Sequence, residues 1–145
     1  MSEESQFCTF YLAGLFFGVQ VTKVQEVIRY QETTPIPLAP ATVSGLINLR
    51  GQIVTAIDLR RVLGLEDRPG DMRPMNVVIH TDEGAVSLLV DKIGDVLHAD
   101  VDSFERIPDT VRGVARDLIL GAYKLTDKLL LVLDTDRIVE PESAM

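Results

Sequence analysis

The chain has 145 residues, 46% of them hydrophobic and 25% charged, a composition typical of one globular domain or of two small lobes with a shared core. Its 22 acidic residues outnumber its 14 basic ones, and the net charge of −8 makes nucleic acid and anionic membrane surfaces poor direct partners. No apolar run approaches the roughly 18 residues of a membrane helix, and the start Met-Ser-Glu-Glu-Ser lacks the features of a signal peptide, so we expect a cytoplasmic protein without membrane insertion.

Short runs rich in aromatic and β-branched residues open the chain. Residues 7–12 and 15–21, separated by Ala13-Gly14, predict a β-hairpin. The single cysteine, Cys8, permits no internal disulfide, and its apolar surroundings favour a buried, inert thiol. After this hairpin, apolar residues recur at every third position, which suits either one helical turn or a twisted edge strand.

The middle of the chain alternates extended segments and turns. Residues 32–40 carry three prolines, which exclude a helix and favour an extended or edge conformation. Residues 46–49 and 52–57 predict a second hairpin, and Asp58 then precedes a short helix over residues 60–63 as its N-cap. Residues 66–74, with two prolines and a glycine, predict a linker.

The rest of the chain repeats this order of elements. Residues 76–81 and 85–90 predict one hairpin, and residues 122–125 and 129–133 predict another. Asp134 precedes a last helical segment over residues 137–139, in the same position as the first acidic cap.

Two aligned blocks indicate an internal repeat. Residues 45–63 align without a gap with residues 121–139, at an offset of 76 (121 minus 45). Residues 16–27 align with residues 85–96 at an offset of 69 (96 minus 27). Two blocks in the same order favour a real duplication over a chance similarity.

Many short strands, few helical stretches and a repeat predict a mainly β fold built from a pair of small β-barrels. We expect a single domain over residues 1–145, with lobe one at approximately 7–70 and lobe two at approximately 71–140. Because each half alone is small for a stable core, we expect the lobes to pack together or to exchange strands.

Catalytic signatures are absent from the sequence. There is no phosphate-binding glycine loop, no His-Glu-x-x-His zinc pair and no Gly-x-Ser-x-Gly elbow, so we predict no enzymatic activity and no cofactor. One acidic cluster offers oxygen ligands, but its spacing is not that of a calcium loop, and a solvated acidic face is favoured over a metal site. The cluster comprises Asp91, Asp95, His98, Asp100 and Asp102.

The two copies differ most at one hairpin turn. Asn48, Arg50 and Gly51 stand where the second copy has Lys124, Thr126 and Asp127. A turn arginine is by default a solvated surface charge, but arginine is also enriched in protein interfaces, and the second copy makes its turn without one. The mismatch therefore favours Arg50 as a contact residue. Glu26 is a second candidate, because its neighbours Val24 and Val27 are apolar, as at the edge of a contact.

Several of these segments resemble the CheW family of bacterial chemotaxis coupling proteins. The resemblance spans about Phe7 to Val139 and rests on Val24-Gln25-Glu26-Val27, on residues 45–54 and 57–60, and on Val90-Asp91 with Asp95-Val96. It implies two intertwined SH3-like five-stranded β-barrels with short helices. It also implies a non-enzymatic adaptor that joins chemoreceptor cytoplasmic tips to the regulatory domain of a chemotaxis histidine kinase and is recruited to receptor arrays at the membrane.

The resemblance also implies roles for matching residues. Asn48, Arg50 and Gly51 are expected at the receptor-facing surface, and Val24, Glu26 and Gly45 are expected to form or support contacts with the receptor or the kinase. The family often has proline at the position of Thr55, so the local backbone there is the main departure. Two alternatives stay open: a regulatory CheW-like domain of a larger kinase or adaptor-receiver protein, and a small-ligand or metal-binding β-barrel.

Overall fold

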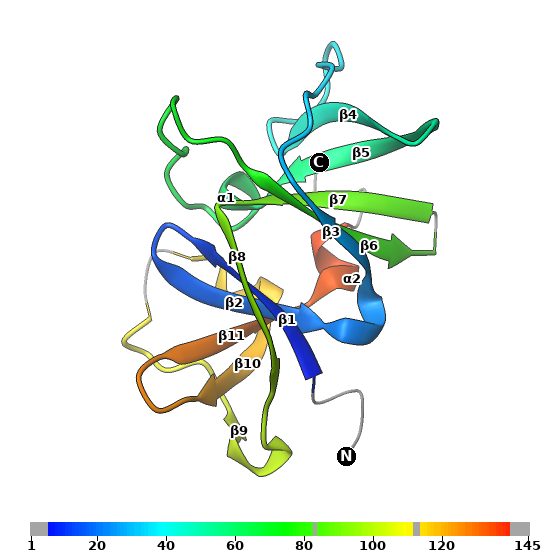
Figure 1. The fold of residues 1–145 in the computed structure, drawn as a ribbon. Coiled ribbons are helices and arrows are strands. Elements are labelled where there is room, and N and C mark those ends of the chain that lie inside the picture. Colours follow the sequence, from blue (N-terminus) through cyan, green and yellow to red (C-terminus); the bar gives the residue numbers. More distant parts are fainter. Residues whose placement is uncertain (1–5, 83, 112–113, 140–145) are drawn as a thin grey trace.

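The fold was analysed in a computed structural model, which describes residues 6–82, 84–111 and 114–139 (Figure 1). The ends of the expected domain, residues 1–5 and 140–145, lie outside the described residues. The strands are β1 (Gln6–Leu12), β2 (Leu15–Gln20), β3 (Val24–Ile28), β4 (Val43–Leu49), β5 (Gln52–Asp58), β6 (Met75–Thr81), β7 (Gly84–Val90), β8 (Lys92–His98), β9 (Phe104–Glu105), β10 (Ile119–Lys124) and β11 (Leu129–Leu133).

The strands form two sheets, each of which takes strands from both halves of the chain. Sheet A has the order β8-β1-β2-β11-β10-β9, and sheet B has the order β3-β6-β7-β5-β4. The hairpin β1–β2 therefore lies in the sheet that holds β10 and β11, while β6–β7 lies beside β5 and β4 (Figure 1). The predicted mainly β fold with two intertwined lobes is confirmed. Sheet A adds the two-residue strand β9 to the expected five, and the lobe boundaries 7–70 and 71–140 stay a prediction.

Parallel pairing joins the two halves within each sheet. Strand β2 pairs with β11 in sheet A, and β5 pairs with β7 in sheet B, and both pairs are parallel. The sheets share one apolar core, in which Phe10 and Phe17 of sheet A pack in the same cluster as Val77 and Leu88 of sheet B. Burial of this shared surface supplies the main non-directional force that holds the two sheets together.

The two helices are short and capped as predicted. Helix α1 (Leu59–Val62) follows Asp58, whose side chain accepts a hydrogen bond from the backbone nitrogen of Arg60. Helix α2 (Thr135–Ile138) follows Asp134, whose side chain accepts from the backbone nitrogen of Arg137. The apolar period after the first hairpin corresponds to a 3₁₀ turn followed directly by the edge strand β3. Among the described residues, no helix is both long enough and apolar enough to cross a membrane.

Candidate partner-binding site

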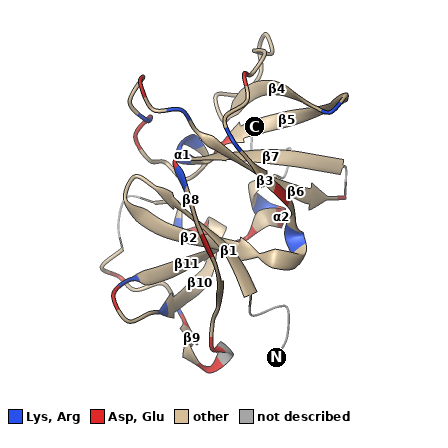
Figure 2. Cartoon of the chain, viewed as in Figure 1, with Lys and Arg blue, Asp and Glu red and all other residues tan. Residues whose placement is uncertain are grey.

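The turn between β4 and β5 is a two-residue hairpin loop. Leu49 pairs with Gln52, and Arg50 and Gly51 between them have φ of 51° and 89°. Two positive φ values in succession suit the right-handed twist of a hairpin, and the second costs little at a glycine. The side-chain oxygen of Asn48 accepts a hydrogen bond from the Gly51 nitrogen at 2.8 Å, which fixes the turn and leaves Arg50 at its tip, where Figure 2 shows basic colouring.

Arg50 forms an ion pair with Glu26, so two of the predicted site residues meet across the sheet. Arg50 Nη2 donates to Glu26 Oε2, and the side chains are 72% and 21% exposed. Glu26 lies on β3 and Arg50 follows β4, and these two strands are the opposite edges of sheet B. The ion pair therefore shows that sheet B curls until its edges approach each other, as in a small barrel.

The ion pair also changes the acidity of both groups. The hydrogen bond from Arg50 lowers the pKa of Glu26 below its ordinary value, and a hydrogen bond from Gln25 acts in the same direction. The same contact with Glu26 raises the pKa of Arg50. Both groups are therefore charged near neutral pH, and the guanidinium keeps donors free for other acceptors.

The remaining predicted residues differ in burial. Val24 is half-buried and packs against the shared core, and Gly45 is buried in β4. Asn48 and Gly51 are exposed. Two apolar side chains nearby in the strands are exposed: Ile53, paired with Asn48, is 60% exposed, and Val27, on the opposite face of β3 from Glu26, is 38% exposed.

The corresponding turn of the second copy has a different backbone. Leu125 and Lys128 flank Thr126 and Asp127, and neither of these two central residues has a positive φ. Asp95, the repeat equivalent of Glu26, lines one hollow with Thr126, Asp127 and Lys128, so it lies near a turn that has a lysine and no arginine. The combination of an outward arginine and a paired carboxylate therefore belongs to the first copy alone.

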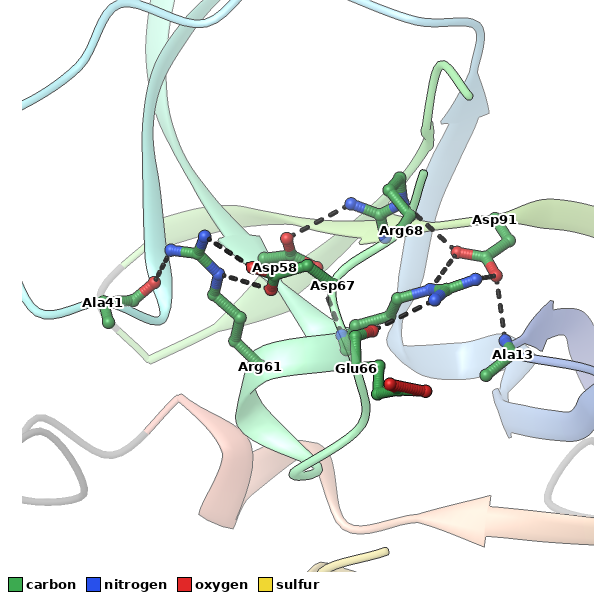
Figure 3. Close-up of polar contacts among 9 residues, drawn as sticks. Ala13, Ala41, Asp58, Arg61, Glu66, Asp67, Arg68 and Asp91 are labelled. Carbon is green, nitrogen blue, oxygen red and sulfur yellow. Dashed lines mark hydrogen bonds and ion pairs between the residues drawn. The ribbon is translucent and has the colours of Figure 1, made fainter. Parts of the chain in front are cut away.

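A buried ionic network, which the sequence analysis missed, lies beside α1 (Figure 3). Arg60 Nε donates to both carboxylate oxygens of Asp91, at 2.9 and 3.1 Å, and Arg60 Nη1 donates to the Glu66 carbonyl at 3.0 Å. Arg68 connects Asp91 to the cap residue Asp58 through two contacts of 3.2 Å. All four ionic side chains are at most 15% exposed.

The prediction that Asp91 belongs to a solvated acidic face is wrong, because its side chain is only 9% exposed. Burial opposes its ionisation, but hydrogen bonds from Arg60 and the Ala13 nitrogen outweigh burial and lower the pKa of Asp91. Within the described ranges, no group of three or more His, Cys, Asp or Glu side chains is placed to hold a metal ion. The only sequence signal for this network was that Asp91 immediately follows an apolar strand.

Comparison with known proteins supplies the family. The family model described as "CheW-like domain" matches residues 6–142. The chain belongs to the CheW-like domain family.

Similar CheW proteins extend along most of the chain. The chemotaxis protein CheW of Treponema pallidum (strain Nichols) is 27% identical over 140 residues, covering 94% of this chain and 82% of the relative. Protein PilI of Pseudomonas aeruginosa is 35% identical over 115 residues, covering 79% of this chain and 64% of that protein. The crystal structure of scaffolding protein TtCheW from Thermoanaerobacter tengcongensis has a TM-score of 0.84 and 26% identity, covering 98% of this chain and 97% of that one.

Membership of the CheW family decides between the function classes that the sequence left open. Proteins of this family are non-enzymatic scaffolds or adaptors, so the chain is an adaptor and not an enzyme. The match to a CheW structure also confirms the two SH3-like barrels. The small-ligand and metal-binding alternatives are not favoured.

Proposed function

We propose that this chain is a cytoplasmic CheW adaptor that couples chemoreceptor cytoplasmic tips to the regulatory domain of a chemotaxis histidine kinase. It would act without a cofactor and be recruited to receptor arrays at the membrane. The proposal is supported by family membership and by the relatives named chemotaxis protein CheW. It is also consistent with a net charge of −8, which disfavours direct contact with nucleic acid or anionic lipid.

The receptor-facing surface would comprise Asn48, Arg50 and Gly51. The observation that carries this part of the proposal is the ion pair of Arg50 with Glu26, because it joins two candidate residues from separate strands into one exposed feature. A guanidinium with free donors can bind carbonyl or carboxylate oxygens of a partner. Glu26 would hold Arg50 in place and offer an acceptor of its own.

The surroundings of the pair fit a helical partner with mixed chemistry. Ile53, one strand pair from the turn, exposes apolar surface next to Asn48, and interfaces commonly combine apolar surface with arginine. An amphipathic receptor helix would place an apolar residue on Ile53 and polar ones toward Arg50. Val24 would support β3 by packing against the shared core, and Gly45 would support β4 by its close approach to Thr34.

Binding measurements with purified components test the proposal. The chain is titrated separately with receptor-tip fragments and with the kinase regulatory domain, and each titration is repeated in the presence of the other partner. We expect dissociation constants in or below the tens of micromolar for both partners and a ternary complex. Binding to neither partner at these concentrations would remove the adaptor proposal.

One alternative within the same fold is a regulatory domain of a larger kinase or adaptor-receiver protein. It is less favoured because the similar proteins are named chemotaxis protein CheW and not kinase or receiver proteins. The encoded reading frame tests this alternative, which requires a frame that also encodes a kinase or receiver domain.

A further inference from the structure

The chain crosses between the two sheets at two positions that the repeat relates to each other. Strand β2 of sheet A leads through the 3₁₀ turn Val21–Lys23 into β3 of sheet B. Strand β7 of sheet B leads into β8 of sheet A through a single residue, Asp91. At the repeat offset of 69, Asp91 corresponds to Thr22 in the middle of the first crossing (91 minus 22).

Asp91 holds both sheets at its crossing. Toward sheet A, its backbone nitrogen donates to the Tyr11 carbonyl at 3.0 Å, and its carboxylate accepts from the Ala13 nitrogen in the β1–β2 turn at 2.8 Å. Toward sheet B, the same carboxylate accepts from Arg60 in α1 and from Arg68 in the following linker (Figure 3). The Arg60, Asp91 and Arg68 side chains are 8%, 9% and 10% exposed.

The first crossing carries a related but much looser contact. Lys23 Nζ lies 4.0 Å from Asp136 of α2, and the side chains are 39% and 84% exposed. Asp136 is the repeat equivalent of Arg60 (136 minus 60 gives 76), so an acid stands there in place of the arginine, whereas Lys23 corresponds to Lys92 (92 minus 23 gives 69) and not to Asp91. Exposed ion pairs at this separation are weak and are screened by salt.

The Asp91 contacts and the Lys23–Asp136 contact differ in how strongly they can constrain the angle between the two sheets. The apolar core shared by the sheets opposes their separation, but apolar packing is non-directional and constrains their relative angle less strongly. Hydrogen bonds from guanidinium groups to a carboxylate are directional, and in a buried site they resist being broken. Among the described residues of the two crossings, only Asp91 combines buried guanidinium hydrogen bonds toward sheet B with a backbone hydrogen bond toward sheet A.

We infer that Asp91 is a positioning residue that fixes the angle between the two sheets. The crossing at Lys23 does not by itself hold this angle when the Asp91 contacts are lost. The Arg50–Glu26 surface of sheet B is then presented at a fixed angle to sheet A. The inference does not depend on the identity of the partners, because the angle is a property of the free protein.

Residual dipolar couplings of backbone amides measure this angle directly. They are recorded for the ¹⁵N-labelled chain and for Asp91→Asn, and alignment tensors are fitted separately to the strands of each sheet. The matched control is Asp136→Asn, which removes the acid of the repeat-related crossing. We expect one tensor to fit both sheets in the unsubstituted chain and in Asp136→Asn, and two different tensors in Asp91→Asn with amide shifts inside each sheet preserved.

The opposite results would overturn the inference. If Asp91→Asn melts at a lower temperature but keeps one tensor with the original orientation, Asp91 serves stability alone. If Asp136→Asn separates the tensors as much as Asp91→Asn, the two crossings are equivalent.

A second variant covers the case in which Asp91→Asn does not fold. The combination Arg60→Met, Arg68→Met and Asp91→Leu replaces the network by apolar side chains, a change that often preserves stability. We expect this variant to fold with two different tensors. Retention of the original single tensor, or failure of this variant to fold, would contradict a positioning role.

Discussion

Gly45 lies directly against the backbone of Thr34. A β-carbon at Gly45 would be 2.9 Å from the Thr34 carbonyl carbon, and the Gly45 φ is 152°. This approach lets the proline-rich segment pair with the edge of β4, since Thr34 and Leu46 exchange two hydrogen bonds of 2.8 Å. The second half repeats the arrangement, because a β-carbon at Gly121 would lie 2.8 Å from the Glu105 carbonyl oxygen.

Gly45→Ala is expected to destabilise the fold. The added carbon meets backbone atoms that cannot move aside cheaply, and the positive φ disfavours alanine, so we expect a loss of about 2 kcal/mol or more. Urea unfolding measures it. Gly70→Ala is the matched control, because a β-carbon at Gly70 would meet no atom of another part of the chain within 4 Å and Gly70 has no positive φ. A Gly45→Ala protein of normal stability that failed to bind partners would instead make Gly45 a direct contact.

The two helix caps are expected to differ in cost when they are removed. Asp134 caps α2 only, so Asp134→Ala should cost about 1 kcal/mol. Asp58 caps α1 and also pairs with the buried Arg68, so Asp58→Ala should cost about 2–4 kcal/mol. Denaturant unfolding of both variants gives the comparison. Equal costs would show that the Asp58–Arg68 contact contributes nothing.

Local patterns were sufficient to predict most of the elements. Alternating apolar runs and turn residues placed the hairpins, and the acidic residues at Asp58 and Asp134 placed both caps. The pairing of β2 with β11 and of β5 with β7 has no comparable signal. Parallel partners far apart in sequence are chosen by tertiary packing, and no short-range turn specifies them.

The candidate site was only partly predictable. The mismatch between the repeats singled out Arg50, but its ion pair with Glu26 depends on how far sheet B curls. Asp91 was assigned to a solvated acidic face because its neighbours are acidic. Its burial depends on Arg60 and Arg68, which are 31 and 23 residues away in sequence, and no local pattern shows that contact.

The ionised Asp91 should contribute stability that is lost in acid. Its pKa is lowered in the folded chain, so the unfolded chain takes up the proton first as the pH falls. This contribution is complete above about pH 4 and disappears as the pH falls through the folded pKa. Urea unfolding of the unsubstituted chain and of Asp91→Asn between pH 7 and about pH 2.5 should show their stability difference narrowing below about pH 4. A difference that stayed constant would contradict the pKa shift.

Arg50→Ala is expected to separate binding from stability. The side chain is 72% exposed, so we expect Tm to change by no more than about 2 °C while receptor-tip affinity falls about tenfold or more. Calorimetry and a thermal melt measure the two effects. Arg106→Ala, at another exposed arginine, is the control and should leave both unchanged. A large fall in Tm would make Arg50 a structural residue.

Exchange of the two charges tests which feature of the ion pair a partner recognises. The double variant Glu26→Arg and Arg50→Glu keeps an ion pair between β3 and the β4–β5 turn, but it moves the guanidinium from the exposed tip to the less exposed strand. If the partner accepts hydrogen bonds from the tip arginine, the double variant should melt like the unsubstituted chain and bind as weakly as Arg50→Ala. Recovery of receptor-tip affinity would instead mean that the ion pair serves only to hold the turn, and that Arg50 makes no contact of its own.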